Sequence, residues 1–125
     1  MAKPATRELV QMAQQAGYQT IEVEQLRPNR WLLILADAGS QLAVLVQARP
    51  LVSSADVQDL ADLVRLRRLD GGILLAYGGT FSPAAHRTHK ELANHRLRLC
   101  TALPPAGRAE HIDAKPVGTA LKPIP

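Results

Sequence analysis

The stretch QLAVLVQARP, from Gln41 to Pro50, decides the fold of this 125-residue chain. Residues 42–46 form an unbroken apolar run rich in β-formers, which is typical of a strand covered on both faces. The run is followed by Gln47 and Arg49, and the two-residue period of a strand puts these polar side chains on one face. The stretch therefore predicts a central strand that carries a site at its carboxyl end.

The residues just before this strand predict its antiparallel neighbour. Residues 31–36 are apolar throughout, and the turn formers at 37–40 join the two strands as a tight hairpin. Residues that face each other in such a hairpin have a nearly constant sum of residue numbers. The end that bears Gln47 is therefore expected to face residues 29–31, with Trp31 opposite Gln47 to within one or two positions.

Three helices and three further strands are expected around the hairpin. Hydrophobic spacing and capping residues predict helices over residues 4–16, from Ser53 or Ser54 onward, and over 83–94, and strands over 18–26, 73–77 and 97–100. The predicted order is αβββαβαβ, which gives an α/β fold with a mixed β-sheet flanked by helices. Residues 1–100 are expected to form one domain, and residues 101–125, where prolines cluster, a Pro-rich C-terminal tail that is mobile or lies along the surface.

Composition narrows the class of protein. The formal charge is +4 and the pI is near 9.7, which is compatible with a polyanionic partner. A single cysteine, Cys100, excludes an internal disulfide and a cysteine-based metal cluster. The first residues lack an apolar signal region, and no apolar run approaches the ~20 residues that span a bilayer. A soluble cytoplasmic protein with no membrane partner is expected.

Two motifs carry a resemblance to a known family. VLVQARP, residues 44–50, ends the third strand, and AYGGTFSPAA, residues 76–85, leads into the last helix. Together they resemble the restriction-endonuclease-like, or PD-(D/E)xK, fold, and more narrowly its Mrr-type branch of type IV restriction endonucleases. That family has an apolar strand ending in (E/Q)xK and a later Thr-Gly-x-Phe-Ser-x-x-Ala loop. The resemblance covers roughly residues 6–100 and implies a three-layer sandwich.

The resemblance implies a metal-dependent nuclease site in which two positions are altered. Gln47 stands at the Glu/Gln position, Arg49 at the lysine position, and Glu8 at that of a helix-one glutamate that assists metal binding. An arginine keeps the charge of lysine but does not deprotonate. Residues 29–31, where the family has an aspartate, contain no carboxylate, and Asp37 lies at the other end of the hairpin. Gln47, Arg49 and Glu8 are thus the residues of a vestigial catalytic site.

The prediction is a nuclease-like domain that binds DNA or another nucleic acid without efficient cleavage. Its expected nucleic-acid contacts are Arg49, Arg30, Arg87 and Lys90. No cofactor is expected, with Mg²⁺ required if the site is active. Two alternatives stay open: an active metal-dependent endonuclease that uses a variant QxR site and a substitute acid, and a homodimeric protein-interaction scaffold with no nucleic-acid role.

Two further residue groups have simpler interpretations. His86 and His89 share a helix face, and without a nearby acid or cysteine they predict a solvated polar face rather than a zinc site. Trp31, at the position where the resemblance would put the aspartate, is expected to pack in the core.

Overall fold

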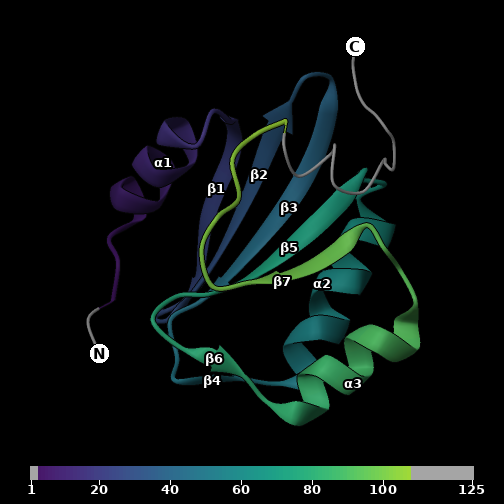
Figure 1. The fold of residues 1–125 in the computed structure, drawn as a ribbon. Helices are drawn as coiled ribbons and strands as arrows, with labels where there is room; N and C mark the ends of the chain where they lie inside the picture. The colour runs from purple at the N-terminus through teal and green to yellow at the C-terminus, as the bar shows by residue number, and fades with distance from the viewer. Residues whose placement is uncertain (1–2, 108–125) are drawn as a thin grey trace.

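The computed structural model describes residues 3–107 and has an α/β fold with three helices and a mixed five-stranded sheet (Figure 1). The predicted element order is confirmed, and two two-residue strands, β4 and β6, were not predicted. In chain order the elements are α1 (Thr6–Gln15), β1 (Gln19–Arg27), β2 (Arg30–Asp37), β3 (Ser40–Gln47), β4 (Leu51–Val52), α2 (Ser54–Leu66), β5 (Gly71–Ala76), β6 (Thr80–Phe81), α3 (Pro83–Leu92) and β7 (Leu97–Cys100).

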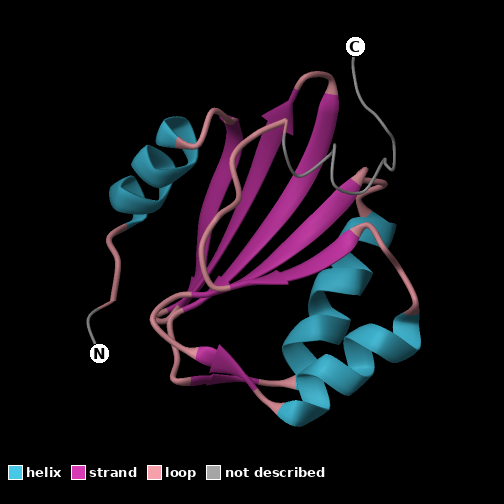
Figure 2. Cartoon of the chain, viewed as in Figure 1, coloured by secondary structure: helices cyan, strands magenta, loops and turns pink. Residues whose placement is uncertain are grey.

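The strands of the main sheet lie in the order β1-β2-β3-β5-β7 (Figure 2). The first three form an antiparallel meander, and β3, β5 and β7 run parallel. The β2–β3 turn is tight because Ala38 and Gly39 both have positive φ, 49° and 93°. Its geometry pairs Gln47 with Arg30, one position from the predicted partner Trp31. The carboxyl ends of the parallel strands therefore meet the start of β2.

The sheet separates two hydrophobic cores. On one face Leu45 and its neighbours pack against α2 and α3, and on the other Val44 and its neighbours pack against α1. Both faces of β3 are covered, as its continuous apolar run predicts. The alternation of side chains along β3 puts Gln47 on the α2 face of the sheet. Trp31 is 2% exposed in the other core, which confirms core packing.

Residues 101–107, which we call the C-terminal strap, lie across the α1 face of the sheet (Figure 1). Ala106 N donates a hydrogen bond of 2.8 Å to Ala16 O, and the Tyr18 hydroxyl donates one of 2.8 Å to Pro104 O. Gly107 N donates to Asp37 Oδ2, also at 2.8 Å. The part of the predicted tail that the structure describes thus lies along the surface, while residues 108–125 fall outside the described residues.

Tyr18 is buried beneath this strap. Burial, and to a smaller extent the negative charge of Asp37, together raise the pKa of its phenol to about 12. Burial likewise raises the pKa of the Cys100 thiol, which is half-buried at the end of β7. Neither group lies on the α2 face of the sheet.

Strand β1 forms an edge of the sheet, and the alternation of its side chains is interrupted at Ile21. The register with β2 shifts between Thr20 and Glu22, so Ile21 falls in a bulge and is 50% exposed instead of facing inward. Val23 faces inward and packs in the α1-side core. Among residues 3–107, none of the helices has both the length and the apolarity to cross a membrane.

Candidate functional site

A buried carboxylate, Asp56, lies at the centre of the residues that the sequence motifs single out. Its side chain is on the first turn of α2, and the residue is 4% exposed. The carboxylate accepts five hydrogen bonds, from Gln47 Nε2 (2.7 Å), Arg30 Nη2 (3.2 Å), Arg49 Nη2 (3.1 Å), Ser53 N (2.9 Å) and Ser53 Oγ (3.1 Å). We call these residues the Asp56 cluster.

Three elements deliver the cluster to one point. Arg30 opens β2 and Gln47 ends β3, and the two residues are paired across the sheet. Helix α2 begins shortly after β3 and packs on the same face. The first turn of the helix therefore lies over the end of β3, where the backbone N–H of Ser53 and the positive end of the helix dipole also favour a carboxylate.

The two arginines differ in how far they are removed from water. The Arg30 side chain is 12% exposed and bridges Asp56 to Asp59, whose Oδ2 is 2.6 Å from Arg30 Nη2. The Arg49 side chain is 41% exposed and forms an ion pair with Asp56. Among residues 3–107, the buried Nε atoms of both arginines find no hydrogen-bond partner. Within that range each guanidinium binds through Nη2, which leaves its other donors unused.

A glycine from the second motif fixes the backbone of Arg49. The Gly79 backbone lies against Arg49 and Pro50, and a Cβ atom at residue 79 would overlap the Arg49 carbonyl oxygen. Thr80 N donates to Pro50 O at 3.0 Å, and β6 pairs with β4 in parallel. The glycine-rich loop thus does more than turn from a strand into a helix, because it clamps the chain that carries Arg49.

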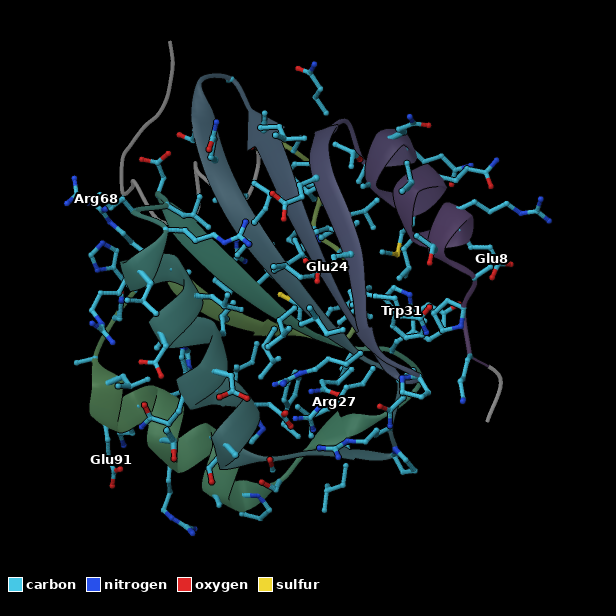
Figure 3. All side chains as sticks on the ribbon, turned by 180° about the vertical axis from the view of Figure 1, so that it is seen from behind. Glu8, Glu24, Arg27, Trp31, Arg68 and Glu91 are labelled. Atoms are coloured by element: carbon cyan, nitrogen blue, oxygen red, sulfur yellow. The ribbon has the colours of Figure 1, made fainter. Side chains whose placement is uncertain are left out.

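Arg27 adds a third arginine at this end of the sheet, on its edge strand β1. It ends β1, is paired with Arg30 in the register of the sheet, and is exposed. Figure 3 shows Arg27 at the end of the sheet that faces β4 and β6. Its side chain has no hydrogen bond or ion pair with any residue in the range 3–107. Sequence reasoning did not identify this residue.

The structure brings together three of the predicted site residues, Gln47, Arg49 and Arg30. Glu8 is not among them, because α1 packs on the other face of the sheet, where Ala5 N donates to Glu8 Oε1 at 2.6 Å. Figure 3 likewise places Glu8 on α1, away from Arg27. Arg87 and Lys90 are exposed on α3 and do not contact Asp56.

The histidines of α3 confirm the predicted solvated polar face only in part, because His86 is exposed and His89 is partly buried. His86 packs edge-on against Phe81, with ring centroids 5.8 Å apart, and His89 Nε2 is 2.6 Å from Leu97 O. Both rings therefore help to hold α3, β6 and β7 together. Over the described part of the chain, no three His, Cys, Asp or Glu side chains are grouped so that they could hold a metal ion.

The Asp56 cluster does not fit the divalent cation that the family resemblance implies. Mg²⁺ is bound by carboxylates that present free oxygens, usually with several waters. Here both oxygens of Asp56 accept hydrogen bonds from arginine, and Arg30 also occupies Asp59. Two guanidinium groups beside the carboxylate repel a cation by Coulomb's law. The cluster is instead suited to holding its arginines in place.

Comparison with known proteins identifies no relative of this chain. No protein-family model, curated protein or solved structure matches this chain.

Proposed function

We propose that this chain is a restriction-endonuclease-like domain of the Mrr type that binds nucleic acid, with DNA as the expected ligand, and does not cleave it efficiently. The observation that supports this most strongly is the Asp56 cluster itself. Gln47 and Arg49, the residues of the family-like motif, lie at the end of the central strand beside Arg30, and their acid partner is neutralised by arginine. Cationic side chains at that position suit phosphate binding.

Inefficient cleavage follows from the chemistry of the same residues. Phosphodiester hydrolysis in such sites uses a metal to polarise water and neutralise developing charge. Arg49 does not act as a base, because its guanidinium stays protonated in proteins. Asp56 already accepts hydrogen bonds from five donors. To bind a metal ion, its carboxylate would have to break at least one of these bonds.

A salt titration tests nucleic-acid binding. Binding is measured by fluorescence anisotropy of a short labelled DNA duplex over a series of NaCl concentrations. The logarithm of the association constant is expected to fall linearly with the logarithm of the salt concentration, with a slope of about 0.9 per phosphate contact. In parallel, duplex and single-stranded DNA are incubated with Mg²⁺ or Mn²⁺. Cleavage that disappears in the Gln47→Ala variant would show that the domain is an active nuclease.

One observation favours that active alternative. Asp56 Oδ1 lies 2.7 Å from Gln47 Nε2, so a carboxylate stands where a variant QxR site needs its substitute acid. In this alternative Asp56 exchanges its arginine partners for Mg²⁺ when DNA binds. The cleavage assay distinguishes the two, because the alternative requires metal-dependent products and the proposed function does not.

The scaffold alternative is favoured by apolar exposure at the edge of the sheet. Ile21 and Leu26 of β1 are 50% and 38% exposed, and a second copy of the chain could cover them. Glu22 and Glu24 on the same edge oppose such pairing, since like charges meet when identical strands align. Absence of DNA binding at low salt, together with a dimeric mass by light scattering, would favour the scaffold.

A further inference from the structure

We propose that the guanidinium groups of Arg27 and Arg49 bind one nucleic-acid phosphate without a divalent cation, and that Asp56 is the positioning residue that holds Arg49 for this contact. The inference rests on the proposed function, because it names the contact through which the nucleic acid is held. It starts from the misfit between the Asp56 cluster and a metal ion. Arginine here supplies the positive charge that a metal supplies in a nuclease.

The first step is the fixed geometry of Arg49. Its backbone is clamped by Gly79, and its Nη2 is tied to Asp56 Oδ2 at 3.1 Å. The side chain is still 41% exposed, and Nη1 has no partner among residues 3–107. A guanidinium that is held on one side and open on the other loses little rotamer entropy when it binds an anion. Arg49 is therefore preorganised to donate outward.

The second step is the position of Arg27. Arg27, Arg30 and Gln47 form a row across β1, β2 and β3 in the register of the sheet. Two strand spacings, or about 10 Å, separate Arg27 from Gln47. Arg49 follows two residues beyond Gln47, so two extended arginine side chains can still close around one phosphate. Arg27 is exposed and has no hydrogen bond or ion pair with the described residues. It is the member of the row that is free to follow a ligand.

The third step is the balance of charge. Three guanidinium groups, those of Arg27, Arg30 and Arg49, stand with two carboxylates, those of Asp56 and Asp59. One positive charge is left over, and a phosphodiester group carries one negative charge. Phosphate binding thus neutralises this end of the sheet without a metal ion.

The test measures binding of a fluorescein-labelled DNA duplex in EDTA, as a function of NaCl concentration. EDTA is expected to leave the affinity of the wild-type protein unchanged. Arg27→Gln and Arg49→Gln are each expected to weaken binding roughly tenfold and to reduce the salt slope by about 0.9. Arg68→Gln is the matched control, because it removes the same charge from an exposed residue beyond the far end of α2 (Figure 3).

The positioning role of Asp56 is tested by the sign of an effect. Asp56→Asn and Asp59→Asn both remove one negative charge beside Arg30. If the carboxylates act only through their charge, both variants are expected to bind DNA more tightly. If Asp56 positions Arg49, Asp56→Asn is expected to bind DNA more weakly, because Arg49 loses its ion-pair partner, while Asp59→Asn is not. Thermal melting of each variant confirms folding. If Asp56→Asn does not fold, Arg27→Gln still decides the phosphate contact, since the Arg27 side chain makes no hydrogen bond or ion pair with the described residues.

Four outcomes count against these proposals, and they are distinct from one another. Binding that is lost in EDTA and restored by Mg²⁺ refutes a metal-free contact. If wild-type protein binds DNA and Arg27→Gln and Arg49→Gln both behave like Arg68→Gln, the phosphate contact lies elsewhere and the proposed function survives. Tighter binding by Asp56→Asn removes its positioning role. Absence of wild-type binding at low salt refutes the proposed function itself.

Discussion

Gly79 and Arg49 meet backbone to backbone, so closely that a Cβ atom on Gly79 would overlap the Arg49 carbonyl oxygen and stand 2.8 Å from the carbonyl oxygen of Pro50. The contact joins the two sequence motifs into one unit. The loop GGTFSPAA holds the strand end QARP, and the short β4–β6 pairing follows directly from it. Gly79, which is remote from Arg49 in sequence, therefore fixes the backbone position from which the Arg49 side chain extends.

Gly79→Ala is expected to destabilise the protein by about 2 kcal/mol, because the added methyl group forces β4 and β6 apart. Urea unfolding measures the loss. Gly39→Ala is the control, since a Cβ atom there meets nothing within 4 Å and its cost comes only from the positive φ of 93°, about 1 kcal/mol. A Gly79→Ala variant no less stable than Gly39→Ala would contradict the clamp.

Asp56→Ala is expected to cost about 3 kcal/mol of unfolding free energy, because it leaves Arg30 without its buried partner and removes the cap of α2. Asp59→Ala removes an ion pair whose carboxylate side chain is 50% exposed, and is expected to cost at most about 1 kcal/mol. Chemical denaturation of both variants at neutral pH provides the comparison. Equal costs would mean that Asp56 is not the centre of the cluster.

Stability is expected to fall as pH rises from 10 to about 12, because of Tyr18. Below pH 10 the phenol is neutral in the folded and the unfolded chain, so its hydrogen bond to Pro104 contributes fully. Above pH 10 the unfolded phenol ionises while the folded one does not, which favours unfolding. Tyr18→Phe should lose about 1 kcal/mol near pH 8 and show a shallower decline at alkaline pH. Urea unfolding across this pH range measures both, and identical slopes would refute the assignment.

Removing the C-terminal strap is expected to destabilise the domain. A chain ending at Cys100 loses the hydrogen bonds to Ala16, Tyr18 and Asp37 and the packing of Leu103, for an expected cost of about 3 kcal/mol. A chain that ends at Gly107 keeps all of these contacts and is the control. Calorimetric melting of the two truncated chains tests this, and equal melting temperatures would show that the strap adds nothing.

Much of the fold was predictable from local pattern. The apolar run 42–46 and the turn at 37–40 were enough to define the β2–β3 hairpin, and glycine and proline punctuation placed the helices. The observed partner of Gln47, Arg30, lies within the predicted range, and its offset of one residue from Trp31 follows from the turn, where Asp37 pairs with Ser40. The exposure of Ile21 was not predictable, because a bulge in β1 interrupts the alternation without a sequence signal at that site.

Asp56 was not predicted as part of the site, because an acid three residues after Ser53 is explained by helix capping alone. Asp56 fits a capping box with Ser53, and that role is real, since Ser53 N donates to Asp56 Oδ2. The family resemblance puts the acid on the second strand and not on the helix. A usable signal was present: α2 starts just after the strand that bears Gln47, so its first turn must lie near that strand end. The structure was required to show that Arg30 reaches Asp56 and that α1, which carries Glu8, packs on the other face of the sheet.

The strap has a consequence for how the chain folds. The hydrogen bond from Ala106 to Ala16 joins the two ends of the described chain, and closing so long a loop costs conformational entropy before any contact repays it. The hairpin of β2 and β3 is local and can form early. We therefore expect Pro104 and Ala106 to dock after the rate-limiting step, so that substitutions there speed unfolding and leave the folding rate unchanged.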